Sequence, residues 1–247
     1  MKSANPYSRR DFVALSVVGP LVGRLPWFRP KELVLGDTRF RIVRNHRSTR
    51  RYVLLDGDQD AARQVLLHHM ESQRGVAYLI EGATREVAIA GGKLDPNRMF
   101  SRAGAEDSLR SLNPGWNQGQ VTAALDLLDG QREKLLDAVF PPDRGLLIAL
   151  GTGAHPVTDA AATAEQHSLP QPDKPQAFYL CTDPADYQAL AASPFNVVLS
   201  RYLRARDDGS LARRAVVRQV RFLHIEARPG DAATQREMLA WAETHLR

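Results

Sequence analysis

Two kinds of hydrophobic segment follow one another along this chain: short continuous apolar runs, and longer stretches in which apolar residues recur with helical spacing. The clearest run, Leu146 to Leu150, holds five consecutive apolar residues, which is typical of a strand buried on both faces. The clearest helical stretch extends from about Val121 to Phe140 and ends at Pro141-Pro142, because proline cannot continue a helix. Strands that alternate with helices in this way predict a largely parallel or mixed sheet covered on both faces.

The predicted fold class is therefore α/β, with three layers in which a mixed sheet lies between helices. A length of 247 residues and a hydrophobic content of 43% suit one domain with a full core. The expected strands are Phe40–Val43, Tyr52–Leu55, Val76–Ile80, Val87–Ala90, Leu146–Leu150, Phe178–Cys181, Asn196–Leu199 and Phe222–Ile225, and the expected helices are Ala61–His69, Val121–Phe140 and Ala232–Leu246.

Three segments lack a regular pattern. Gly91-Gly92 is expected to open a loop that carries Asp95 to Arg98, and Ser101 to Gln118 is a polar region rich in Gly, Pro and Asn. The segment from Gly151 to Gln176 is rich in Ala, Thr, Pro and Gln and is too long for an ordinary connection. We expect it to be a lid or mobile flap.

The N-terminus combines Ser8-Arg9-Arg10-Asp11-Phe12 with a weakly apolar run from Val13 to Gly23. This arrangement resembles a twin-arginine export signal. The run is shorter than the roughly 20 residues that a membrane-spanning helix needs, so no stable membrane span is expected. An amphipathic N-terminal helix is the alternative, and no small-residue cleavage site can be placed. The predicted organisation is a signal segment at residues 1–29 and one domain at residues 30–247, with a periplasmic or extracellular location.

Charge and cysteine content exclude further classes. Residues 1–29 carry a net charge of +4, which leaves only +1 of the total +5 for residues 30–247. A nearly neutral domain with 7% aromatic residues lacks the electrostatic signature of a nucleic-acid-binding protein. Cys181 is the only cysteine, so neither an intrachain disulfide nor a thiolate metal cluster can form.

Common catalytic signatures are missing from the sequence. It contains no His-Glu-x-x-His, no Gly-x-Ser-x-Gly, no phosphate-binding loop and no dinucleotide-binding fingerprint. The acidic stretch Asp56-Gly57-Asp58-Gln59-Asp60 alternates carboxylates as a calcium loop does, but Ala61 and Leu67 occupy the positions of the required glycine and terminal acid. Calcium binding is therefore not expected.

Two separate segments carry a family resemblance. Leu94-Asp95-Pro96-Asn97-Arg98-Met99-Phe100 has a Pro-Asn-Arg-x-Phe pattern, and Phe222-Leu223-His224-Ile225-Glu226-Ala227 is a late strand that ends in Glu. Together they resemble the substrate-binding and general-base motifs of the zinc carboxypeptidases and the succinylglutamate desuccinylase-like enzymes. The resemblance covers most of residues 40–247 and implies a zinc-carboxypeptidase-like fold. It also implies that Asn97 and Arg98 bind the carboxylate of a substrate and that Glu226 is the catalytic base.

The positions at which that family holds its metal differ in this chain. The first His and the Glu of the family's His-x-x-Glu fall on Asp56 and Gln59, and the third ligand falls on Gly151. A catalytic zinc needs three protein donors and an open position, so we expect neither a metal nor another cofactor. His155 lies four residues beyond Gly151 and is the alternative source of a ligand.

The expected function is binding of a peptide or an acylated amino acid, through its carboxylate and without hydrolysis. Arg98 offers a planar fork that suits a carboxylate, and the Asn97 amide can add a second contact. One alternative is an active carboxypeptidase or amidase-type hydrolase that uses a displaced metal site built from Asp56, His155 and Glu226. Another is a structural or interaction protein, in which Asp95 to Arg98 form only a turn and Glu226 only an ion pair.

Overall fold

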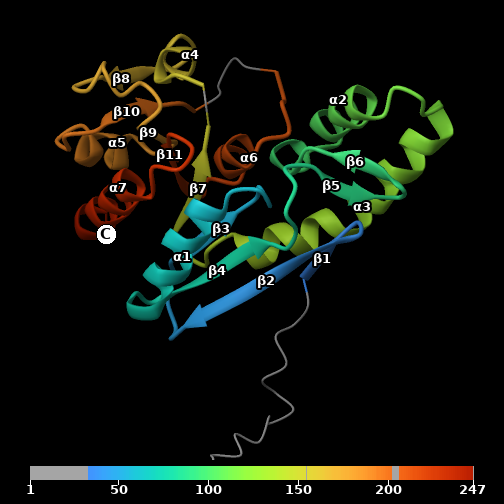
Figure 1. Cartoon of the computed structure of the whole chain (residues 1–247), viewed down its shortest axis with the longest axis horizontal. Coiled ribbons are helices and arrows are strands. Elements are labelled where there is room, and N and C mark those ends of the chain that lie inside the picture. Colours follow the sequence, from blue (N-terminus) through green and yellow to red (C-terminus); the bar gives the residue numbers. More distant parts are fainter. Residues whose placement is uncertain (1–32, 154, 202–205, 247) are drawn as a thin grey trace, which may run out of the picture. The chain divides into compact units, whose positions relative to one another are not determined.

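Nine strands pair into one mixed sheet in the computed structural model, which describes residues 33–153, 155–201 and 206–246 (Figure 1). Their order across the sheet is β1-β2-β4-β3-β7-β11-β9-β10-β8. A separate hairpin is formed by β5 and β6. The strands are β1 (Leu33–Leu35), β2 (Thr38–Asn45), β3 (Arg51–Leu54), β4 (Gly75–Ile80), β5 (Val87–Ile89), β6 (Gly92–Leu94), β7 (Leu146–Thr152), β8 (Gln166–Ser168), β9 (Phe178–Cys181), β10 (Asn196–Leu199) and β11 (Arg221–Ala227).

The centre of the sheet is parallel, and this decides which residues meet. The strands β4, β3, β7 and β11 pair in parallel, whereas β2, β9 and β8 each add an antiparallel pairing. The carboxyl ends of parallel neighbours meet at one edge of a sheet, which is where ligands bind in open α/β folds. Residues that follow β3, β7 and β11 are therefore brought together although they are far apart in the sequence.

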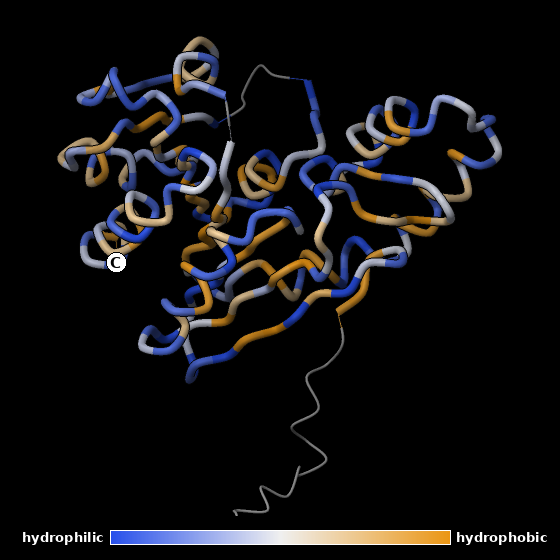
Figure 2. The backbone as a smooth tube through the Cα atoms, in the orientation of Figure 1, coloured by the Kyte–Doolittle hydropathy of each residue, from blue (hydrophilic) through white to orange (hydrophobic). Residues whose placement is uncertain are grey.

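Helices cover both faces of this sheet. Alternate residues of β3 point to opposite faces, so that Tyr52 and Leu54 join one core and Val53 joins the other. The first core also contains residues of α1, α5 and α7, and the second contains residues of α2, α3 and α6. Figure 2 shows the hydrophobic positions concentrated on the central strands between these helices. The helices are α1 (Asp60–Ser72), α2 (Arg102–Leu112), α3 (Gln118–Val139), α4 (Val157–Ala161), α5 (Pro184–Leu190), α6 (Leu211–Val217) and α7 (Ala232–His245).

These findings confirm the predicted α/β class and the mixed sheet with helices on both faces. The long helix α3 begins where Asn117 and Gln120 form a capping box, in which each side chain accepts a hydrogen bond from the backbone of the other residue. It ends at Val139, directly before Phe140 and the Pro141-Pro142 pair. The predicted strands and helices in the regular parts of the chain agree with the structure to within a few residues at each end.

The three segments predicted to be irregular contain regular structure. The region from Ser101 to Gln118 holds α2, which Ser101 caps by accepting a hydrogen bond from the backbone N–H of Gly104. The prediction of a loop after Gly91 is wrong at Gly92–Leu94, which is β6. The supposed flap from Gly151 to Gln176 contains the end of β7, the short helix α4 and the edge strand β8, so it is not an unstructured lid.

Three further elements, β1, α5 and α6, were not predicted. None of the described helices is long and apolar enough to cross a membrane. The predicted signal segment at residues 1–29 lies outside the described residues.

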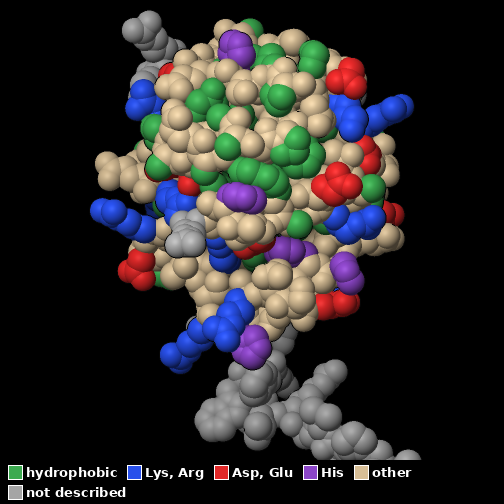
Figure 3. All heavy atoms as spheres, turned by 90° about the vertical axis from the view of Figure 1, so that its left-hand side faces the viewer, with side chains coloured by type: hydrophobic (Ala, Val, Ile, Leu, Met, Phe, Trp, Pro, Cys, Tyr) green, Lys and Arg blue, Asp and Glu red, His purple; other side chains and the backbone are tan. Residues whose placement is uncertain are grey.

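The surface of the described part of the chain is mostly polar or charged where it is exposed. In that part, Leu127 and Val217 are the large hydrophobic side chains with the greatest exposure. On the face shown in Figure 3, charged side chains surround small groups of hydrophobic ones.

Candidate functional site

A cavity of about 400 Å³ lies at the carboxyl ends of β3, β7 and β11. Its volume falls in the range of small-molecule sites, which are mostly apolar with a few polar groups that orient a ligand. One part of the wall is apolar and includes Leu55, Leu150, Phe178, Leu180 and Phe222. The polar and charged lining residues are Asp56, Gln59, Arg85, Asn97, Thr152, His155, Ser210, His224 and Glu226.

Asp56 is held in place by two side-chain amides. The Nδ2 atom of Asn97 donates a hydrogen bond to Oδ1 of Asp56 at 2.7 Å, and the Nε2 atom of Gln59 donates one to Oδ2 at 2.6 Å. Asp56 is buried, and burial raises the pKa of its carboxyl group while the hydrogen bond from Asn97 acts in the opposite direction. Each carboxyl oxygen thus has an amide donor from a different element.

The end of β7 is fixed by two glutamines. Gln59 donates to the carbonyl of Thr152 and accepts from its backbone N–H, both at 3.0 Å. The buried Gln235 of α7 donates to the carbonyl of Gly151 at 2.8 Å. All hydrogen-bonding capacity of the Gln59 amide nitrogen is used by Asp56 and Thr152, so Gln59 is bound to the cavity wall rather than directed at a ligand.

Glu226 and His224 lie side by side next to this end of β7, because β11 pairs with β7 and residues two apart in a strand point to the same face. The Nε2 atom of His224 is 3.1 Å from Oε2 of Glu226. The glycines at positions 151 and 153 leave the room for this pair. A Cβ atom at Gly151 would lie 2.4 Å from Nε2 of His224, and one at Gly153 would lie 2.1 Å from Oε1 of Glu226.

The two side chains of this pair titrate far from their usual ranges. Burial, with a smaller contribution from Asp56, raises the pKa of Glu226 to about 7, against the opposing effects of Arg85 and His155. Burial lowers the pKa of His224 to about 4, and Asp56 acts in the opposite direction. Near neutral pH, His224 is therefore uncharged and Glu226 exchanges its proton readily, which are properties of groups in functional sites.

The structure brings most of the predicted site residues together. Asp56, Asn97 and Glu226 line the cavity, and His155 lies at its border with a side chain that is 89% exposed. Arg98 does not line it. Its side chain is half exposed, lies 4.0 Å from the carboxylate of Asp95 and borders a smaller surface pocket next to α2.

Among the titratable residues that line the cavity, His224 and Arg85 were not predicted. His224 could have been found, because it shares a strand face with Glu226. Arg85 lies in the polar connection between β4 and β5, where no pattern in the sequence distinguishes it from the other arginines.

Whether the site can hold a metal ion depends on the side chains that could coordinate it. Within the described ranges, no group of three or more His, Cys, Asp and Glu side chains is arranged to bind a metal ion. Asp56, His155 and Glu226 therefore do not form such a group, and Gly151 contributes no side chain. The residues present do not fit the zinc site of the resembled family.

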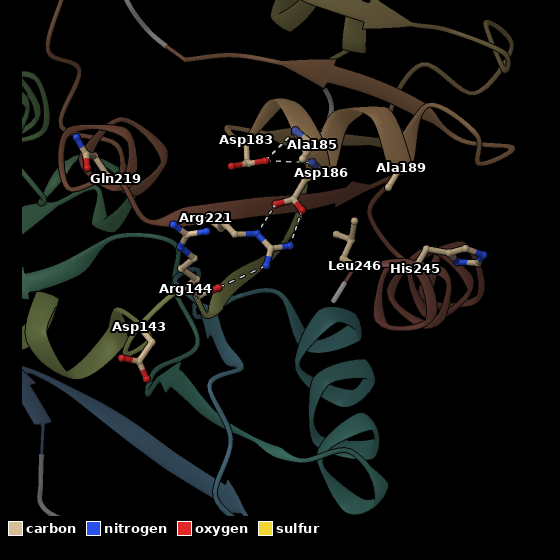
Figure 4. A pocket seen from close by; sticks show the side chains of 10 residues that line it. All are labelled: Asp143, Arg144, Asp183, Ala185, Asp186, Ala189, Gln219, Arg221, His245 and Leu246. Atoms are coloured by element: carbon tan, nitrogen blue, oxygen red, sulfur yellow. Dashed lines mark hydrogen bonds and ion pairs between the residues drawn. The ribbon is translucent and has the colours of Figure 1, made fainter.

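A second cavity, of about 520 Å³, lies at the opposite ends of β7 and β11 (Figure 4). Three of its charged side chains, those of Asp183, Asp186 and Arg221, are engaged with the protein itself. Arg221 points toward Asp186, with Nε at 3.1 Å from Oδ2, and Asp183 caps α5 through the backbone N–H groups of Ala185 and Asp186. This cavity therefore has a structural explanation, and the cavity around Glu226 is the stronger candidate for a functional site.

No known protein family matches this chain, and no curated protein matches its sequence.

Replacing Glu226 with glutamine is expected to change how stability depends on pH. The pKa of Glu226 rises from its ordinary value of 4.5 to about 7 in the folded protein. The protonated carboxyl group of Glu226 is compatible with burial, whereas its ionisation is less favourable in the folded protein than in the unfolded chain. The stability that depends on this proton is fully present below the pKa of the group in the unfolded chain and is lost as the pH rises through its pKa in the folded protein. This shift of the pKa corresponds to a decrease of about 3 kcal/mol in the free energy of unfolding as the pH rises through this range.

The measurement is urea denaturation of the wild type and of Glu226→Gln at acidic and at mildly alkaline pH. Stability of the variant relative to the wild type should increase by about 2 to 3 kcal/mol from roughly pH 5 to roughly pH 8. The same substitution at the exposed Glu237 is the control and should leave the pH dependence unchanged. Parallel pH profiles for the wild type and Glu226→Gln would contradict the burial of an ionisable carboxyl group at this position.

Proposed function

We propose that this chain is an exported protein with a zinc-carboxypeptidase-like fold whose cavity binds a peptide or an acylated amino acid without hydrolysing it. One observation carries the proposal. The positions that the resemblance assigns to the metal ligands and the base are 56, 59, 151 and 226, and residues at all four line one cavity although they lie in or just after three different strands, β3, β7 and β11. Such a meeting is what a shared architecture requires, since in the resembled family these positions surround one site.

The side chains at these positions favour binding over hydrolysis. Asp56 and Gln59 are hydrogen-bonded to each other instead of being open to an ion. Any side chain at Gly151 would collide with His224. Without a metal ion, Glu226 lacks the cation that lowers the pKa of an attacking water molecule in metallohydrolases.

Arg85 takes the role that the sequence suggested for Arg98. Arg85 is one of the residues that line the cavity, and its positive charge lowers the pKa of both Asp56 and Glu226. A guanidinium group binds a carboxylate through two parallel hydrogen bonds. We therefore assign the carboxylate of the ligand to Arg85, with Asn97 as a second polar residue beside Asp56 and an apolar side chain of the ligand against Phe178 and Phe222.

Calorimetric titration with the dipeptide Ala-Leu and with its C-terminal amide tests this proposal. The free acid should bind at least tenfold more tightly than the amide, since charged hydrogen bonds contribute about 1.5 to 3 kcal/mol. No hydrolysis should be detected in the same samples. Equal affinity for the two forms would refute carboxylate recognition.

The proposed export depends on Arg9 and Arg10, which lie outside the described residues. Replacing both with lysine is expected to leave the protein in the cytoplasm, because the twin-arginine pair is the feature that such signals share. Cell fractionation with immunodetection is the measurement. Replacing Lys2 and Arg24 is the matched control and should preserve export, and envelope localisation of the Arg9 and Arg10 variant would rule out this route.

A further inference from the structure

Two largely buried carboxyl groups line the cavity. The carboxyl group of Asp56 follows β3 and that of Glu226 lies near the end of β11; burial raises the pKa of both groups, and the charge of Asp56 raises the pKa of Glu226 further. The charged or titratable groups that face them are Arg85 from the β4–β5 connection, His155 from the segment after β7, and His224 from β11 itself. Arg85 is exposed and His155 is 89% exposed, so water screens both more than it screens the carboxyl groups.

One carboxyl oxygen remains available to a ligand. Oε2 of Glu226 contacts His224, whereas no hydrogen bond from any other described residue reaches Oε1. That oxygen lies over Gly153, where even a methyl group would not fit. The cavity therefore presents a hydrogen-bond acceptor in a partly apolar space, and such a group is satisfied best by a charged donor.

The guanidinium group of Arg85 thus favours a negative group on the ligand, whereas the carboxyl groups of Asp56 and Glu226 favour a positive one. A ligand with a carboxylate alone would meet Arg85 but would leave the carboxyl groups without a counter-charge. A ligand with an amine alone would leave Arg85 without a partner. Both requirements are met by a molecule that carries an amine and a carboxylate.

We propose that the ligand is a free amino acid or short peptide whose protonated amino group binds Oε1 of Glu226 while its carboxylate binds Arg85. This inference rests on the proposed function and narrows it, because it excludes acylated amino acids as preferred ligands. It also predicts a proton movement. A cation beside Glu226 favours the ionised carboxylate, so the carboxyl proton of Glu226 passes to the buffer when the ligand binds near neutral pH.

Calorimetry with the full-length protein and three probes tests the inference: Ala-Leu, N-acetyl-Ala-Leu and Ala-Leu amide. Ala-Leu should bind at least tenfold more tightly than either derivative. Titrations in two buffers with different ionisation enthalpies should show proton release for Ala-Leu close to neutral pH. In Glu226→Gln the proton release should disappear, whereas Glu237→Gln on the exposed side of α7 should retain it.

The outcomes separate this inference from the function on which it rests. If N-acetyl-Ala-Leu binds as tightly as Ala-Leu, the amino group is not recognised and the inference is wrong, while carboxylate binding stands. If the amide binds as tightly as the free acid, carboxylate recognition fails as well. Absence of binding by all three probes would overturn both, and proton release that persists in Glu226→Gln would overturn the role of that residue.

Discussion

Replacing Gly153 with alanine is expected to weaken binding in the cavity strongly. The added Cβ atom would lie 2.1 Å from Oε1 of Glu226, a distance that forces the carboxyl group away from its place. The displaced side chain would lose its contact with the ligand and would enter the space that the ligand needs. Loss of a buried charged contact costs about 2 to 5 kcal/mol, so affinity for Ala-Leu should fall on the order of a hundredfold or more.

Gly130→Ala is the matched control for this variant. Gly130 lies within α3, and an added Cβ atom there meets no other atom within 4 Å. Alanine in a helix interior is more favourable than glycine, so this variant should be at least as stable as the wild type and should bind normally. Calorimetry and thermal unfolding of both variants distinguish local displacement of Glu226 from general unfolding. Normal affinity in a folded Gly153→Ala protein would show that Glu226 does not contribute to the site.

The second large effect is expected at Arg85. Arg85→Ala should weaken binding of Ala-Leu by more than about tenfold, because a charged hydrogen-bonding partner of the carboxylate is removed. Arg85→Lys should recover only part of this loss, since an ammonium group cannot form the planar two-bond contact. Binding should be measured by calorimetry at low and moderate salt.

Arg98→Ala is the control in the same experiment. The side chain of Arg98 borders a different surface pocket and lies 4.0 Å from Asp95, so its removal should change affinity little. A strong loss of binding in Arg98→Ala together with normal binding in Arg85→Ala would reverse the assignment of the carboxylate site.

Regular parts of the fold were predictable because burial leaves a periodic pattern in the sequence. The apolar run from Leu146 to Leu150 is buried throughout, and the stretch that became α3 has a strong capping box and a proline stop. The helix α2 was missed because few of its residues are large and apolar, and it is held by the Ser101 cap and by packing of Ala105 and Leu109. The edge strand β8 was missed because its three residues are all polar and none is buried, and only pairing with β10 makes them a strand.

The candidate site was predictable where it depends on strand ends. Asp56 and Glu226 each follow or end a central strand, and parallel pairing guarantees that such positions meet. The sequence could not assign Arg98, because Asn97 and Arg98 lie in a 3-10 helix at Pro96–Arg98. Successive residues of such a helix point about 120° apart, so the contact of Asn97 with Asp56 directs Arg98 elsewhere. Arg85 comes from a connection whose position depends on the tertiary structure.

Metal dependence is the most direct test of a binding cavity that works without an ion. The measurement combines metal analysis of the purified protein with titration and product analysis of Ala-Leu, once with added zinc and once with a strong chelator. We expect no stoichiometric zinc, the same affinity in both conditions and intact dipeptide at the end. Tightly bound zinc at one equivalent, with hydrolysis that the chelator and Glu226→Gln both abolish, would contradict the proposed function and establish a metallohydrolase instead.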